Sequence, residues 1–216
     1  MNSYDASNAR ILSLLSEYLT YTPRFITEDT ISEMISACGV SQPYAFAMLL
    51  AAGCGLDMEA NPADKALYHQ YFSEMVHRLD ADAYRANPYY KTIQTPQTEM
   101  SGITPTHQSY APYEAFVCND LLPKPDGRIL PQIGYFDTAF AFPAILEDGR
   151  VWMTITPNEI ETMREPIRNS HGRVLALGLG LGYFAFMAAE KTDVESVTIV
   201  EQNEAVIQLF TEHLLP

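Results

Sequence analysis

Residues 173–201 carry the clearest pattern of apolar and polar positions in the chain, RVLALGLGLGYFAFMAAEKTDVESVTIVE. The first five are almost wholly apolar and stop at Gly178, as in a strand that is buried on both faces of a parallel sheet. Glycines then alternate with other residues as far as Gly182, and Glu201 closes the stretch nineteen residues later. The predicted elements are a strand at 173–177, a helix at 183–191 and a second strand at 196–200.

Apolar residues also recur at helical spacing in four stretches of the first ninety residues. Thr27 predicts the start of the second helix, because its hydroxyl can accept from a free amide, and Gly39 predicts the end. The third stretch, QPYAFAMLLAAG, contains no Arg, Lys or Asn to reach a base edge, which favours a packing helix over a DNA-reading one. We therefore expect a helical domain at 1–90, with helices at 9–20, 28–38, 41–52 and 61–79.

A stretch rich in Pro, Thr, Gln, Ser and Tyr follows the helices and predicts a linker at 91–112. Beyond it we expect a small β-region at 113–156, which ends in a hairpin because Asp148-Gly149 is typical of two-residue turns. Thr156-Pro157-Asn158-Glu159 has the pattern of a capping box with proline at the first helical position. The predicted strands are 114–118, 128–136 and 139–146, and the predicted helix is 157–169.

The alternating glycines indicate a turn that binds a cofactor. Glycine permits a tight bend with positive φ and lets a ligand lie against the main chain. The first amides of the following helix carry partial positive charge, and a carboxylate at Glu201 can accept both hydroxyls of a ribose. These features predict a nucleoside-containing cofactor at the carboxyl ends of two parallel strands. The candidate cofactor-binding residues are Gly178, Leu179, Gly180, Gly182, Glu201 and Gln202.

The spacing of the glycines bears on the identity of the cofactor. Dinucleotide-binding folds use G-x-G-x-x-G/A. Counted from Gly178 the last position is Tyr183, which is a mismatch, whereas counted from Gly180 it is Ala185, which matches but leaves two extra residues before the turn. An NAD(P)-dependent enzyme therefore remains an alternative.

The stretch resembles the first motif of class I S-adenosylmethionine-dependent methyltransferases, in which an acidic residue and one further residue precede G-x-G-x-G. Gly178, Gly180 and Gly182 match the three glycines, and Glu201 matches the acid that closes the second strand. Ala176 departs from the motif, because most of the family has Asp or Glu there. The resemblance implies S-adenosylmethionine as cofactor, held by the glycine turn and Glu201, and it assigns no catalytic residue and no metal.

The layout before the first strand is also similar to that of polyamine aminopropyltransferases, the spermidine synthase family, which share the fold. That family places a β-hairpin and a short helix there, and residues 139–169 follow the same order. Leu181 departs from the Asp of that family's glycine loop, and the helix at 157–169 lacks its tyrosine and histidine. The resemblance therefore implies a shared architecture, with aminopropyl transfer as a further alternative.

These patterns predict an α/β fold with a helical N-terminal domain, a β-hairpin region and, at 157–216, the first βαβα unit of a Rossmann-like methyltransferase fold. Asn203 predicts the cap of the last helix in this unit. The resemblance implies further strands beyond Pro216, so the predicted fold is incomplete. A sheet left open in this way would have uncovered apolar faces and strand edges. We therefore expect either a longer protein, or a partner or second copy that covers the sheet.

Composition restricts the class of function. The 216 residues are 47% hydrophobic and carry a net charge of −14, with an acidic excess in both halves, so a nucleic-acid partner is not expected. Cys38, Cys54 and Cys118 form no C-x-x-C pair, which argues against a zinc site and fits a reducing cytoplasm. No apolar run approaches the roughly 18 residues of a membrane span. We therefore expect a cytoplasmic protein without a membrane partner.

The sequence thus predicts the N-terminal portion of an S-adenosylmethionine-dependent methyltransferase, with the methyl acceptor left open. The alternative from another class is a non-catalytic binding or assembly module built on half of this fold. In that case the open sheet serves as an interface, and a homo-oligomer is compatible with either reading.

Overall fold

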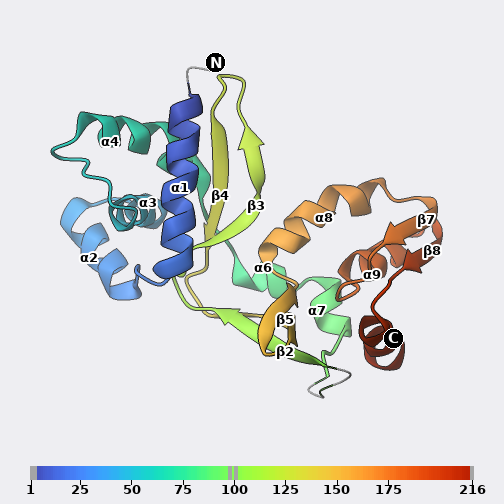
Figure 1. The fold of residues 1–216 in the computed structure, drawn as a ribbon. Coiled ribbons are helices and arrows are strands. Elements are labelled where there is room, and N and C mark those ends of the chain that lie inside the picture. The colour runs from blue at the N-terminus through green and yellow to red at the C-terminus, as the bar shows by residue number, and fades with distance from the viewer. Residues whose placement is uncertain (1–3, 97–98, 100–101, 215–216) are drawn as a thin grey trace. The chain divides into compact units, whose positions relative to one another are not determined.

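The computed structural model describes residues 4–96, 99 and 102–214. The chain is a mixed α/β protein that divides into two compact units, and Figure 1 follows it in colour from the N-terminus to the C-terminus. The first unit comprises Met1–Asp80 and Tyr110–Phe140, and the second comprises Ala81–Ser109 and Ala141–Pro216. The sequence predicted domains that follow one another along the chain. Instead, the helices before residue 80 share a unit with strands that come after residue 110.

Helices make up most of the first unit, and a sheet of order β1-β4-β3 completes it. As predicted, the Thr27 hydroxyl accepts from the amide of Thr30 at 3.3 Å, and Gly39 ends that helix with a φ of 62°. The third helix buries Ala45, Phe46, Ala47, Leu50 and Ala51, as expected of a packing helix. The elements are α1 (Asp5–Tyr21), α2 (Glu28–Cys38), α3 (Gln42–Gly53), α4 (Pro62–Leu67), η1 (Tyr68–Phe72), α5 (Ser73–Met75), β1 (Val76–Arg78), β3 (Phe116–Pro123) and β4 (Ile129–Tyr135).

The helix predicted at 61–79 is wrong beyond Met75. After α4 the chain forms the π-helical turn η1 and the short helix α5, and β1 then pairs in parallel with β4. The amide of Leu79 continues this ladder by donating to the carbonyl of Tyr135 at 2.9 Å. Tertiary pairing with a distant strand therefore overrides the local helical pattern.

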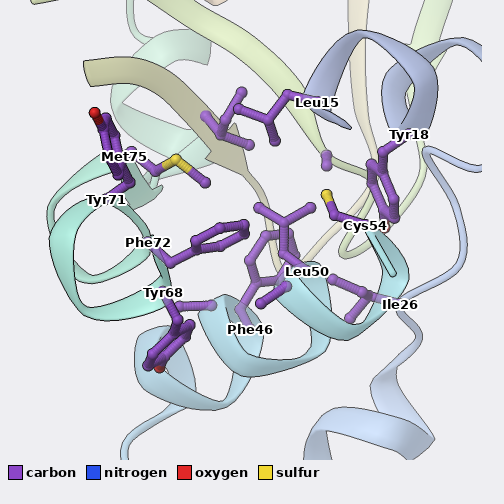
Figure 2. Close-up of a cluster of buried hydrophobic side chains, with 14 of the residues drawn as sticks. Leu15, Tyr18, Ile26, Phe46, Leu50, Cys54, Tyr68, Tyr71, Phe72 and Met75 are labelled. Atoms are coloured by element: carbon purple, nitrogen blue, oxygen red, sulfur yellow. The ribbon is translucent and has the colours of Figure 1, made fainter. Parts of the chain in front are cut away.

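The core of the first unit lies where its helices meet the sheet. Figure 2 shows Phe46, Leu50, Phe72 and Met75 pointing into a common interior. The Phe46 ring stacks on that of Tyr135 with centroids 3.9 Å apart and planes inclined by 7°, and both side chains are fully buried. This stacked pair joins α3 to β4.

The second unit combines a hairpin, a parallel strand pair and the helices around them. Asp148 and Gly149 form the predicted two-residue turn, with φ values of 49° and 74°, between antiparallel β5 and β6. The elements are α6 (Ala81–Arg85), α7 (Pro88–Thr92), β2 (Ile103–Tyr110), β5 (Phe140–Glu147), β6 (Arg150–Thr154), α8 (Pro157–Asn169), β7 (Gly172–Leu177), α9 (Tyr183–Ala189), β8 (Val194–Val200), α10 (Glu204–Leu209) and η2 (Phe210–Leu214).

The segment predicted as a linker at 91–112 contains the end of α7 and the strand β2, which joins the sheet of order β2-β5-β6. Part of the predicted linker, residues 97–98 and 100–101, lies outside the described residues. Within β2 only Ile103 and Pro105 are buried. The polar residues and the proline of this strand hide the alternation by which a strand is usually predicted.

A separate core holds the second unit together, and it fixes the glycine turn. Tyr89 of α7 is buried in this core, and its ring packs edge-on against Tyr183 and Phe186 of α9. The Tyr89 hydroxyl donates to the carbonyl of Leu181 at 2.5 Å. Leu181 itself is buried, so one side of the turn belongs to the core.

Candidate functional site

The strand, turn, helix and strand predicted at 173–201 are present as β7, the glycine turn, α9 and β8. The two strands are parallel, with Leu177 opposite Val200 at their carboxyl ends. The Gly178 amide extends the ladder by donating to the carbonyl of Val200 at 2.8 Å. The glycine turn therefore leaves the sheet at the edge where open α/β sheets bind their ligands.

The three glycines of the turn all have positive φ, but they meet different surroundings. A Cβ atom at Gly178, where φ is 91°, would have no atom within 4 Å. At Gly180, where φ is 56°, it would meet only the Met153 sulfur at 3.7 Å. At Gly182, where φ is 79°, it would lie 2.5 Å from the ring of Phe210. The first two glycines thus border open space, whereas Gly182 is needed for packing against η2.

A pocket of about 700 Å³ lies against the open side of the turn. One wall is the segment from Leu175 to Leu181, which includes the candidate residues Gly178, Leu179 and Gly180. The facing walls come from β6 through Trp152 and Met153, from α8 through Glu159 and Met163, and from α9 through Tyr183 and Phe184. The residues that line the site are therefore mostly apolar and aromatic.

Glu201 and Gln202 are not among the described residues that line this pocket. One oxygen of the Glu201 carboxylate accepts from the amide of Leu179 at 2.8 Å, and the other accepts from the amides of Gln202 at 2.8 Å and Asn203 at 2.9 Å. These backbone donors, with that of Asn203 the strongest, hold the pKa of Glu201 below its usual value. Glu201 therefore connects the glycine turn to the end of β8.

The remaining acceptor capacity of Glu201 is small. A carboxylate offers about four lone-pair positions, and three of them are used by backbone amides. The expectation that Glu201 accepts both hydroxyls of a ribose would need two further bonds. The lone-pair count leaves room for one such bond.

Replacing Glu201 with glutamine is expected to destabilise the second unit by about 1–2 kcal/mol at pH 7, because one oxygen acceptor becomes an amide group. A carboxyl whose pKa is lowered on folding contributes stability above its unfolded pKa and loses it as the pH falls through the folded value. The difference in unfolding free energy between the parent and Glu201→Gln should thus persist down to about pH 5 and shrink below it. Urea unfolding followed by fluorescence of Trp152, the single tryptophan, measures this.

The matched control is Glu195→Gln, which changes an exposed glutamate in β8, the strand that ends just before Glu201. We expect it to leave the unfolding free energy unchanged. Equal effects of the two substitutions would contradict the role given to the Glu201 carboxylate.

Glu159 is a residue of the pocket that sequence reasoning missed. The sequence predicted it only as the last member of a capping box, and the structure does form one half of that box, in which the Thr156 hydroxyl accepts from the Glu159 amide at 3.5 Å. Glu159 lines the pocket, and partial burial raises the pKa of its carboxyl group. Its position on the helix that leads into β7 was the only sequence signal for this role.

Other types of site receive no support from the described residues. Within them, no group of three His, Cys, Asp or Glu side chains lies close enough to hold a metal ion, and Cys38, Cys54 and Cys118 are free thiols. No single described helix is long and apolar enough to cross a membrane, although α2 and α3 reach that length as a pair bent by 111°. No family model, curated protein or solved structure matches this chain.

Proposed function

We propose that the second unit binds S-adenosylmethionine and that the protein is a methyltransferase. The observation that carries the proposal is the open space beside Gly178, which leaves the main chain of the turn accessible to a ligand at the carboxyl ends of parallel strands. The adjoining pocket of about 700 Å³ lies within the range of roughly 300–1,000 Å³ that small-molecule sites occupy. Its apolar walls suit an adenine ring and an aliphatic chain.

In this proposal the residues of the turn hold the ligand by their main chain. Gly178, Leu179 and Gly180 lie against it, and Glu201, which does not line the pocket itself, holds the Leu179 amide and so fixes the turn. S-adenosylmethionine, when bound, supplies an electrophilic methyl group. The task of the protein is then to hold that group in line with the acceptor, since methyl transfer depends mainly on positioning.

Calorimetric titration with S-adenosylhomocysteine tests the proposal. We expect binding with a dissociation constant on the order of micromolar, and at least a tenfold loss of affinity in Ala176→Phe, whose ring enters the pocket from β7. The control Ser196→Phe adds the same ring to the exposed surface of β8 and should leave affinity unchanged. Binding of NAD without binding of S-adenosylhomocysteine would overturn the proposal in favour of an oxidoreductase.

A second candidate is an assembly module, which one observation favours. Leu175, Leu177 and Val200 are 65%, 80% and 55% exposed, so the sheet of β7 and β8 presents large apolar side chains. Contiguous apolar surface of this kind is typical of interaction sites. A stable dimer in sedimentation, together with no binding of S-adenosylhomocysteine, would favour this candidate, and a monomer would count against it.

A further inference from the structure

Among the described residues, Glu159 differs from the other acidic residues of α8 in having no partner. Glu161 pairs with Arg164 at 2.6 Å and also accepts from the Tyr84 hydroxyl, and Glu165 pairs with Arg168 at 3.2 Å. Among the residues that the structure describes, none forms a hydrogen bond or an ion pair with the Glu159 carboxyl. The one acid of α8 that lines the pocket is therefore the one left unpaired.

The surroundings of Glu159 make this position unfavourable for a carboxylate in the absence of a ligand. Burial disfavours the charged form, which is why the pKa of Glu159 lies above its ordinary value. The described residues that line the pocket include no Lys, Arg or His, and β7 contributes the uncharged Ala176 to the opposite wall. A negative charge that the protein leaves uncompensated in a pocket suits a ligand that brings a positive charge.

The aromatic residues of the pocket favour the same kind of ligand. Trp152 and Phe184 line the pocket together with Glu159, and the faces of such rings attract cations. Tyr183 is the other titratable group on the lining, and its hydroxyl accepts from the Asn87 amide at 3.1 Å. A carboxylate among aromatic rings is the chemistry that recognises an alkylammonium group.

We infer that the Glu159 carboxylate binds the ammonium group at the methionyl end of the ligand, an inference that rests on the proposed function. Under it, Glu159 is a binding residue that sets the specificity of the pocket for the amino acid portion of the cofactor. The glycine turn holds the opposite, nucleoside portion through its main chain. The pocket would then discriminate between nucleosides that carry an ammonium group and those that lack one.

Three nucleosides separate the contributions to binding in a calorimetric titration. S-adenosylmethionine has both an ammonium and a sulfonium, S-adenosylhomocysteine has the ammonium alone, and methylthioadenosine has neither. Because a charge-assisted hydrogen bond is lost, Glu159→Gln should weaken the binding of S-adenosylmethionine and S-adenosylhomocysteine by about 10-fold to 100-fold. It should weaken the binding of methylthioadenosine by less than about twofold. Glu159→Asp keeps the charge and should recover part of the loss.

Glu165→Gln is the matched control, because it removes a carboxylate of the same helix that is 73% exposed and paired with Arg168. It should leave all three affinities unchanged. Trp152 fluorescence during urea unfolding checks that each variant is folded, and Glu159→Gln should be at least as stable as the parent at pH 7, since it removes an unpaired, half-buried charge.

The pH dependence of affinity supplies a readout that a merely structural role would not produce. Protonation of Glu159 removes the charge, so affinity for S-adenosylhomocysteine should fall as the pH drops through the raised pKa of Glu159, and Glu159→Gln should abolish this dependence. The other charged groups of α8 nearby are the paired Glu161 and Arg164, and the pKa of Tyr183 is raised by burial, above this range.

The outcomes separate the two proposals. Equal losses for all three nucleosides, or no loss for S-adenosylhomocysteine in Glu159→Gln, would overturn the role of Glu159 and leave the proposed function standing. Failure of the parent protein to bind any of the three would overturn both.

Discussion

Replacing Phe46 with alanine is expected to destabilise the first unit by about 3–5 kcal/mol. The Phe46 side chain is fully buried and stacks on Tyr135. Its removal leaves a cavity beside the Tyr135 ring that the surrounding helices cannot fill completely. The measurement is urea unfolding followed by the reaction of thiols with a chromogenic disulfide. Cys54 and Cys118 are buried in the first unit and react only when it opens, whereas Cys38 is exposed and serves as an internal reference.

The same change at Phe25 provides the control, because that ring is 53% exposed in the same unit. Phe25→Ala should cost less than about 1 kcal/mol. Trp152 fluorescence reports on the second unit in the same samples. Phe46→Ala should shift the unfolding transition seen by Trp152 fluorescence less than the transition seen by thiol reaction. Similar losses for Phe46→Ala and Phe25→Ala would show that the stacked pair is not a main contributor to the stability of this core.

Gly182→Ala is expected to destabilise the second unit by about 2–4 kcal/mol. Two effects add here, because an alanine with a φ near 79° is strained and its Cβ would lie 2.5 Å from the Phe210 ring. Urea unfolding followed by Trp152 fluorescence measures the loss. Gly178→Ala is the matched control, since it has the backbone strain without the collision and should cost only about 1–2 kcal/mol.

A double-mutant cycle isolates the steric part of this effect. In a Phe210→Leu background the smaller side chain leaves room for the new methyl group, so Gly182→Ala should cost no more there than Gly178→Ala does in the parent. An undiminished cost in that background would mean that backbone strain alone explains the requirement for glycine.

The parts of the fold that sequence predicts well are those that local chemistry decides. The turn at Asp148-Gly149 needs two residues that accept positive φ, and β7, the glycine turn and α9 show their periodicity within a short stretch. The parts it misses depend on distant partners. Val76–Arg78 becomes β1 only because β4 is there to pair with it, and β2 has few apolar residues of its own to reveal it.

Some residues of the candidate site could likewise be predicted from the sequence, and others could not. The sequence predicts that Gly178, Leu179 and Gly180 face a ligand, and in the structure these residues line the pocket. Gly182 has the same backbone conformation but packs against Phe210, which no spacing of glycines can distinguish from ligand contact. The identity of the cofactor and the reaction stay predictions. Glu159 could not be identified because its place on the pocket lining depends on how α8 packs against α9.

The interleaving of the two units has a consequence for synthesis on the ribosome. Residues up to Asp80 cannot complete their sheet until β3 and β4 have emerged, and by then Ala81–Ser109 has already left the exit tunnel without its own partners. Neither half of the protein can therefore be obtained by simple truncation near residue 80 or 110. Nascent chains of intermediate length should be prone to aggregation until the residues after Ala141 have emerged and can pack with Ala81–Ser109.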